Sequence, residues 1–130
     1  MSDETTGPTP YELIGGEAGV RRLVDAFYDA MDRREDAAAV RALHPKSLQG
    51  SREKLFWWFS GWLGGPQLYV ERKGHPRLRM RHLPFAIDQA GADAWMVCMF
   101  EALDATVEDE ELRSMIELNL GKLAYHMVNR

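Results

Sequence analysis

The chain has 130 residues, 45% of them hydrophobic, which fits a single globular domain. Its 16 Lys and Arg and 20 Asp and Glu give a net charge of −4, which disfavours binding of nucleic acid or a membrane surface by the whole domain. One cysteine, Cys98, excludes an internal disulfide, and no apolar run is long enough to span a bilayer. The polar start MSDETTGPTP lacks the apolar core of a secretory signal. We therefore expect a cytoplasmic protein with a disordered tail over residues 1–10 and one domain over residues 11–130.

Apolar residues recur at helical spacing through the first half of the chain. The earliest predicted helix has Tyr28 at the edge of an apolar stripe formed by Val20, Leu23, Val24, Phe27 and Met31. A shorter helix is expected within DAAAVRALHP and should end before Pro45. The next helix is expected to start at Ser47 or Ser51 and to end at Leu63, where GGP follows. Its inward stripe is predicted to contain Leu48, Ser51, Leu55, Trp58 or Phe59, and Trp62.

The second half of the chain continues the helical pattern after an irregular stretch over residues 66–74. Pro76 is expected to open a helix of about two turns that Pro84 closes. A long helix should follow with Asp88 as its cap and one inward face formed by Ala92, Trp95, Met96, Met99 and Leu103. The last helix is expected to begin near Asp109 and to bury Leu112, Ile116, Leu120, Leu123 and Met127. Strand alternation is absent from the sequence, so the predicted fold class is all-α.

The segment GHPRLRMRHLPFAI, residues 74–87, is basic within an acidic chain and contains His75 and His82. Seven helical residues separate these histidines by about 10 Å along the axis, which excludes joint binding of one metal ion. Zinc-type signatures are absent, whereas a haem needs only one histidine from the protein. Read as a haem segment, it offers His82 to iron and three apolar contacts to the macrocycle from Leu78, Phe85 and Ile87. A solvated histidine on a basic surface helix explains the residues of this segment equally well.

Further motifs accompany this segment in a fixed order along the chain. They are FYDAM at Phe27–Met31, GGP at Gly64–Pro66, GHPRLRMRHLPF at Gly74–Phe85, DAW at Asp93–Trp95, and HMVN at His126–Asn129. Together the pattern from Tyr11 to Asn129 resembles the group II truncated haemoglobins. The GHP-to-RHLPF segment is its most specific element, while DAW or FY alone would be weak.

The resemblance implies a two-over-two helical sandwich around a b-type haem, so that residues 11–130 form a truncated globin domain. His82 matches the proximal histidine that binds iron. Tyr28 and Trp95 match the distal tyrosine and tryptophan of the group, and Ser51 and Leu55 match two further distal positions. One position departs from the family, because His44 stands where most members have Phe or Tyr. An imidazole there can donate, accept or bind iron.

The remaining haem contacts expected from the sequence surround the basic segment. Arg79 and Arg81 are suited to the two haem carboxylates, because a guanidinium presents a planar fork of donors. His75 is expected to cap the short helix or to lie beside a propionate. Tyr69 either reaches a propionate or is a surface hydroxyl, and Leu55 adds an apolar contact on the distal side.

The function implied is reversible binding of dioxygen and related diatomic ligands, CO and NO, with distal donors that slow oxygen release. An alternative is a haem-dependent redox enzyme that acts on peroxide, nitric oxide or nitrite and takes electrons from an external reductase. A third hypothesis is an interaction module whose basic segment binds nucleic acid or an acidic protein, but the overall charge disfavours it. The sequence leaves monomer and homodimer open. It also leaves open whether Tyr28 or His44 occupies the sixth iron position.

Overall fold

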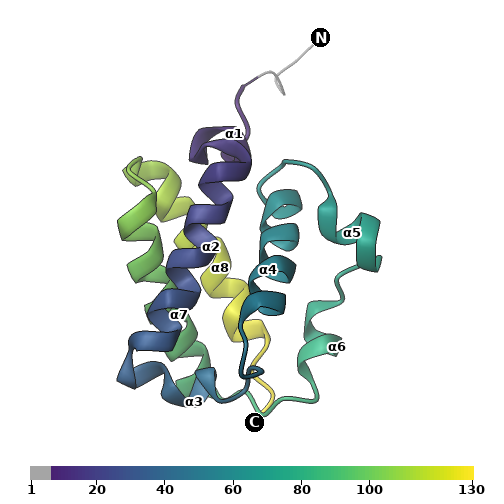
Figure 1. Cartoon of the computed structure of the whole chain (residues 1–130), viewed down its shortest axis with the longest axis vertical. Coiled ribbons are helices and arrows are strands. Elements are labelled where there is room, and N and C mark those ends of the chain that lie inside the picture. The colour runs from purple at the N-terminus through teal and green to yellow at the C-terminus, as the bar shows by residue number, and fades with distance from the viewer. Residues whose placement is uncertain (1–6) are drawn as a thin grey trace.

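The computed structural model describes residues 7–130, and these residues form helices and loops without a strand (Figure 1). The all-α prediction is therefore confirmed for this part of the chain. In chain order the elements are α1 (Pro10–Ile14), α2 (Gly16–Arg33), a 3-10 turn (Glu35–Ala37), α3 (Ala38–Arg41), α4 (Gln49–Trp62), α5 (Leu68–Lys73), α6 (Leu78–His82), α7 (Gln89–Thr106) and α8 (Glu110–His126). Among these helices, none has the length and apolar composition to cross a membrane.

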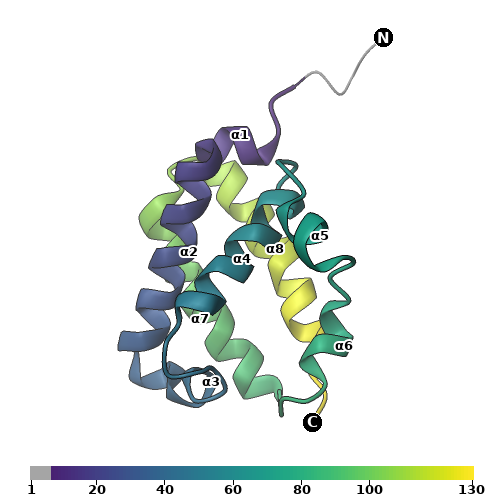
Figure 2. The same cartoon turned by 45° about the vertical axis from the view of Figure 1, so that its right-hand side comes forward.

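Four long helices form two layers, with α2 and α4 in one layer and α7 and α8 behind them (Figures 1 and 2). The closest packing joins α2 to α7, and it buries the predicted apolar stripe of α2 completely. Burial of that stripe removes several large apolar side chains from water, which is the main favourable contribution to folding. The core is completed from α7 and α8 by Met96, Met99, Leu103, Ile116 and Leu120.

The starts of the long C-terminal helices follow from local capping. The Asp88 carboxylate accepts a hydrogen bond from the Gly91 amide at 2.8 Å, and the Asp109 carboxylate accepts one from the Leu112 amide at 2.9 Å. Both predicted starts are thereby confirmed. Thr9 caps α1 in a capping box, so this helix begins at Pro10, inside the expected tail. The first six residues of that tail lie outside the described residues.

Three predicted elements were wrong in detail. Residues 66–74 are not irregular throughout, because they contain α5. The short helix begins at Leu78 and not at Pro76, since Arg77 takes a left-handed conformation with φ of 46°. The helix expected up to Pro45 is instead a 3-10 turn followed by the single turn of α3, which ends at Arg41.

The inward face of α4 also differs from the prediction. Its buried residues are Phe56, Phe59 and Ser60, and Ser60 donates a hydrogen bond to the Pro66 carbonyl at 2.7 Å. Of the predicted stripe, Leu48 and Phe59 are buried as expected, whereas four members are only half-buried: Ser51, Leu55, Trp58 and Trp62. The prediction selected a neighbouring face of the helix, because aromatic residues occur all round its C-terminal half. The half-buried face is the one on which the resemblance places distal residues.

Candidate functional site

His82 is the last residue of α6 and is half-buried. Its Nδ1 lies 2.6 Å from the Leu78 carbonyl oxygen, one turn earlier in the same helix. Because a carbonyl can only accept, Nδ1 carries the proton and donates it. The lone pair is then on Nε2, which has no partner within residues 7–130. A histidine ligand of a metal usually has this arrangement, in which a second hydrogen bond fixes the tautomer and the ring orientation.

Three polar aromatic side chains from different elements are linked by ring contacts through Phe27 and Tyr28. The Phe27 ring centroid lies 4.9 Å from that of Tyr28 and 4.9 Å from that of Trp95 on α7. On the other side of Tyr28, the His44 ring follows at 5.9 Å in an edge-on arrangement. The fold therefore brings Tyr28, Trp95 and His44 into one neighbourhood, although more than 60 residues separate Tyr28 from Trp95 in the chain.

Two of these side chains are hydrogen-bond donors without an acceptor in the described part of the chain. Neither the Tyr28 hydroxyl nor the Trp95 indole N–H makes a hydrogen bond there, although Tyr28 is only 5% exposed. Buried donors are nearly always paired, so an unpaired one indicates a group that a ligand can satisfy. Burial raises the pKa of Tyr28 well above its ordinary value, and the nearby Arg52 guanidinium opposes this shift only in part. The hydroxyl is therefore protonated and available as a donor at pH 7.

His44 has a different hydrogen-bonding character from its neighbours. Its Nδ1 lies 2.9 Å from the Val40 carbonyl oxygen and donates to it, which leaves Nε2 as an acceptor. Burial lowers the pKa of His44, and the bond to Val40 opposes this shift only in part, so the ring is neutral at pH 7. In this tautomer Nε2 has no proton to give to a ligand. It can instead accept from a hydroxyl such as that of Tyr28, or bind a metal.

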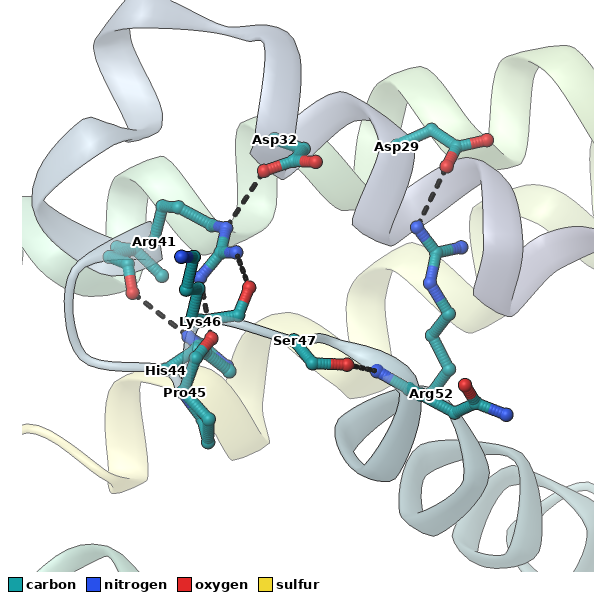
Figure 3. A network of polar contacts seen from close by, with 10 residues as sticks. Asp29, Asp32, Arg41, His44, Pro45, Lys46, Ser47 and Arg52 are labelled. Carbon is teal, nitrogen blue, oxygen red and sulfur yellow. Dashed lines mark hydrogen bonds and ion pairs between the residues drawn. The ribbon is translucent and has the colours of Figure 1, made fainter.

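The loop that carries His44 is held by Arg41 (Figure 3). The Arg41 guanidinium pairs with Asp32 of α2 at 2.8 Å. Its two terminal nitrogens donate to the Pro45 carbonyl at 2.9 Å and to the Lys46 carbonyl at 2.7 Å. One side chain thus satisfies two carbonyl groups of the loop and ties them to α2. A planar fork of donors is suited to this, and a lysine could not reproduce it.

A second arginine joins the start of α4 to α2. The Arg52 guanidinium pairs with Asp25 at 3.0 Å and with Asp29 at 2.8 Å, and the latter contact is seen in Figure 3. It also lies over the Tyr28 ring, 5.8 Å from its centroid. Ion pairs at this exposure contribute little stability each. Their consequence here is geometric, because they fix α4 beside the helix that carries Tyr28.

We expect Arg41→Gln to loosen residues 42–47 while the remainder of the protein keeps its structure. The variant loses the ion pair and both carbonyl contacts, and hydrogen bonds from a charged donor contribute about 1.5–3 kcal/mol each. Amide hydrogen exchange in this loop should accelerate at least about tenfold. Arg33→Gln is a matched control, because within residues 7–130 Arg33 pairs only with Glu101, on the outer surface. Unchanged exchange in the loop would show that Arg41 does not hold it.

The apolar residues predicted to contact a macrocycle lie at the half-buried side of α4 and around α6. Leu55 and Leu78 are half-buried. Leu83 is 50% exposed and Phe85 is 43% exposed, so both apolar side chains are accessible to a ligand. Ser51 is half-buried on the same helix as Leu55. Three hollows on the described surface lie elsewhere, and none of these three is lined by His82, Tyr28 or Trp95.

The basic segment is used partly by the fold itself. Arg79 donates to the His126 carbonyl at 2.8 Å and to the Val128 carbonyl at 3.2 Å. Arg81 donates to the Pro76 carbonyl at 2.6 Å, and its guanidinium lies over the ring of the half-buried Tyr69 at 5.7 Å. None of these contacts was expected from the sequence, which assigned both arginines to the haem carboxylates alone.

The prediction that His75 caps the short helix was wrong, because the N-cap residue of α6 is Arg77 and no side chain caps this helix. The His75 Nδ1 accepts a hydrogen bond from the Arg77 amide at 3.0 Å, and this bond closes the turn before α6. The sequence reasoning missed Asn129, whose side chain contacts the end of α6 and the residues after it from the segment that follows α8. Asn129 is part of the HMVN motif, which was the available signal in the sequence. A motif does not indicate, however, which groups its residues contact.

These residues fit a haem. His82 offers one ring nitrogen with a free lone pair, and unpaired donors from Tyr28 and Trp95 lie in the neighbourhood of α2 and α7. Exposed apolar side chains at Leu83 and Phe85 offer contacts to a flat hydrophobic ring. A porphyrin supplies four of the iron ligands, so a single histidine is enough from the protein.

Comparison with known proteins agrees with this site. The model of the bacterial-like globin family matches residues 9–129. A group II 2-on-2 haemoglobin from Agrobacterium tumefaciens is 46% identical, with a TM-score of 0.93 and coverage of 99% of this chain and 98% of its own. A cold-adapted truncated haemoglobin from Pseudoalteromonas haloplanktis TAC125 is also 46% identical, with a TM-score of 0.93 and coverage of 95% and 99%.

A group 2 truncated haemoglobin of Bacillus subtilis is 40% identical over 121 residues, which are 93% of this chain and 89% of that protein. The two-over-two sandwich predicted from the sequence motifs is confirmed by the solved neighbours. Haem-based binding of diatomic ligands follows from the family. The chain therefore belongs to the bacterial-like globin family, and within it to the group II truncated haemoglobins.

Proposed function

We propose that this protein binds haem b through His82 and reversibly binds dioxygen and related diatomic ligands, CO and NO, on the opposite face. The observation that carries the proposal is the hydrogen bond from His82 Nδ1 to the Leu78 carbonyl, which directs the lone pair of Nε2 away from its own helix. His82 would hold the haem, and the haem would supply an iron atom able to bind a diatomic molecule.

Tyr28 and Trp95 are the distal donors in this proposal. Dioxygen bound to ferrous haem carries partial negative charge, so a neutral O–H or N–H aimed at it stabilises the bound state, whereas CO gains less. Support comes from the two unpaired donors and from the raised pKa of Tyr28, which keeps its hydroxyl protonated. A truncated haemoglobin of Bacillus subtilis whose structure is solved is named oxygen-avid, and it is 39% identical to this chain with a TM-score of 0.86.

His44 is proposed to orient the Tyr28 hydroxyl by accepting its hydrogen bond, or to bind iron itself. Both roles use the free Nε2, since Nδ1 is committed to the Val40 carbonyl. In the first role His44 competes with the ligand for the Tyr28 proton, which moderates the retention of dioxygen. Ser51 and Leu55, half-buried on α4, are proposed to complete the distal side, with Leu55 as an apolar wall.

On the proximal side we propose that Leu78 and Phe85 contact the macrocycle and that the propionates lie near Arg81 and Tyr69. Arg81 and Tyr69 already lie together, and both remain accessible. His75 and Arg79 stay candidates for the same carboxylates. Their described hydrogen bonds engage one nitrogen of each side chain, His75 Nδ1 and one terminal nitrogen of Arg79.

The exposed basic residues of this region support one further proposal, that an external reductase returns ferric iron to the ferrous state. Arg72, Lys73, Arg77 and Arg81 are all exposed, and they interrupt an otherwise acidic protein. An electron donor with an acidic surface would be attracted to them at low ionic strength.

Visible spectra of the ferric and ferrous protein across pH test the proposal. We expect a Soret band after expression with haem available, and spectral changes when the ferrous protein is exposed to dioxygen and to CO in turn. Bis-histidine features that vanish in His44→Ala would assign the sixth position to His44. A protein that stays colourless when haem is supplied, or a ferrous form that binds neither gas, would contradict the proposed function.

A further inference from the structure

The helix that carries His82 is held differently from the rest of the fold. No residue of α6 is buried, and α6 is absent from the helix pairs that pack closely on one another. It lies at one side of the molecule, next to the C-terminal end of α8 (Figure 2). The hydrophobic packing that fixes α2, α4, α7 and α8 therefore does not fix the position of His82. The position of α6 must therefore be fixed by hydrogen bonds.

Asn129 supplies most of these hydrogen bonds. Its side-chain Nδ2 donates to the His82 carbonyl at 3.3 Å and to the Phe85 carbonyl at 3.0 Å. Its Oδ1 accepts from the Ile87 amide at 3.0 Å, and its backbone amide donates to the Ile87 carbonyl at 2.8 Å. One residue thus contacts both the end of α6 and the loop that connects α6 to α7.

Arg79 makes a second connection between the same two parts. Its guanidinium donates to the carbonyls of His126 and Val128, at the end of α8. The last carbonyls of a helix have no partner within the helix and carry partial negative charge, so a cation placed there is favourable. Residues 126–129 are therefore hydrogen-bonded to α6 at Arg79 and again at His82.

We propose that Asn129 is the positioning residue of the proximal histidine and that, together with Arg79, it makes the C-terminal segment 126–129 a clamp on α6. The inference rests on the proposed role of His82. The amide of Asn129 holds the backbone of the residue whose ring is to bind iron, and it does so from 47 residues away in the chain. Loss of the clamp allows α6 to move, which weakens the bond between His82 and iron without disturbing the core.

Asn129→Asp tests the clamp in the full-length protein purified with haem. The carboxylate keeps the acceptor for the Ile87 amide but loses both donors, and its charge faces the His82 and Phe85 carbonyls. We expect hydrogen exchange at the amides of Arg81 and Leu83 to accelerate at least about tenfold. Transfer of haem to excess apomyoglobin should accelerate by a similar factor, and the iron–histidine stretching band of the ferrous protein should shift.

The matched control is Asn119→Ala. Asn119 also donates its side-chain amide to a backbone carbonyl, that of Met115, but it does so within α8 and away from α6. The control should change none of the three measurements. With haem removed from both proteins, the thermal midpoint of Asn129→Asp should stay close to that of the parent, because α6 contributes nothing buried to the core.

Two results would overturn the inference. Unchanged exchange at α6 would show that Asn129 does not hold this helix. Faster exchange with unchanged haem transfer and an unshifted stretching band would show that it holds the helix without positioning the ligand. A separate experiment tests the proposed function itself. If His82 does not bind haem, His82→Gly retains haem. The exchange measurement on Asn129→Asp still reports whether Asn129 holds α6.

Discussion

His82→Gly is expected to lose haem during purification and to show no Soret band. The side chain supplies the proximal protein bond to iron in the proposed site, and residues that merely support such a ligand already change metal affinity by about 10–100-fold. Loss of the ligand itself should lower haem affinity by at least about 100-fold. Addition of imidazole should restore haem binding in this variant, because the glycine leaves space where the ring was.

His126→Ala is the control, since this exposed histidine uses only its backbone carbonyl in the contacts described here, and alanine keeps the end of α8 helical. Its Soret band should equal that of the parent. Normal haem retention by His82→Gly would remove His82 from the proximal role, and a lack of response to imidazole would show that the variant lost more than a ligand.

The sequence predicted the long helices well because their determinants are local. The stripe of α2 follows from the spacing of apolar residues alone. Asp88 and Asp109 indicate helix starts, because each side chain accepts a hydrogen bond from the amide three residues later. The inward face of α4 was less predictable. With Phe56, Trp57, Trp58, Phe59 and Trp62 on one helix, hydrophobicity does not distinguish the core face from a face that borders a ligand.

The supports of the site could not be predicted for a different reason. Arg41 reaches carbonyls four and five residues ahead and a carboxylate on α2, and Asn129 reaches the His82 carbonyl across the fold. A carbonyl group has no residue-specific signature, so a side chain that binds one leaves no pattern in the sequence. The tautomer of His44 is hidden similarly, because its Nδ1 bonds the Val40 carbonyl.

The contacts of Arg41 and Asn129 are alike in kind. Arg41 donates to the loop that carries His44, and Asn129 donates to the end of the helix that carries His82. In each case the candidate site residue belongs to a short segment with few buried residues. Long packed helices supply Tyr28 and Trp95, which therefore need no such support. A polar clamp is the physical alternative where hydrophobic packing is absent, since every hydrogen bond in it is directional.

Tyr28→Phe is expected to speed dioxygen release at least about tenfold, since a hydrogen bond to a partly charged acceptor is worth about 1.5–3 kcal/mol. The phenyl ring keeps the contacts with Phe27 at 4.9 Å, so the change removes the donor and little else. CO release should change less, because bound CO is a weaker acceptor. Stopped-flow displacement of each gas gives both rates.

Without a bound gas, Tyr28→Phe should be as stable as the parent. Faster gas release with unchanged stability would distinguish a functional hydroxyl from a structural one. The Tyr28 hydroxyl is buried without an acceptor in the described part of the chain, so its removal relieves an unsatisfied donor and costs no hydrogen bond. Tyr125→Phe is the control, because its hydroxyl bonds Asp93 on the outer surface and should leave gas release unchanged. Equal oxygen release in the parent and Tyr28→Phe would assign the distal donor to Trp95 alone. A large drop in the thermal midpoint of Tyr28→Phe would instead mean that the hydroxyl serves the fold.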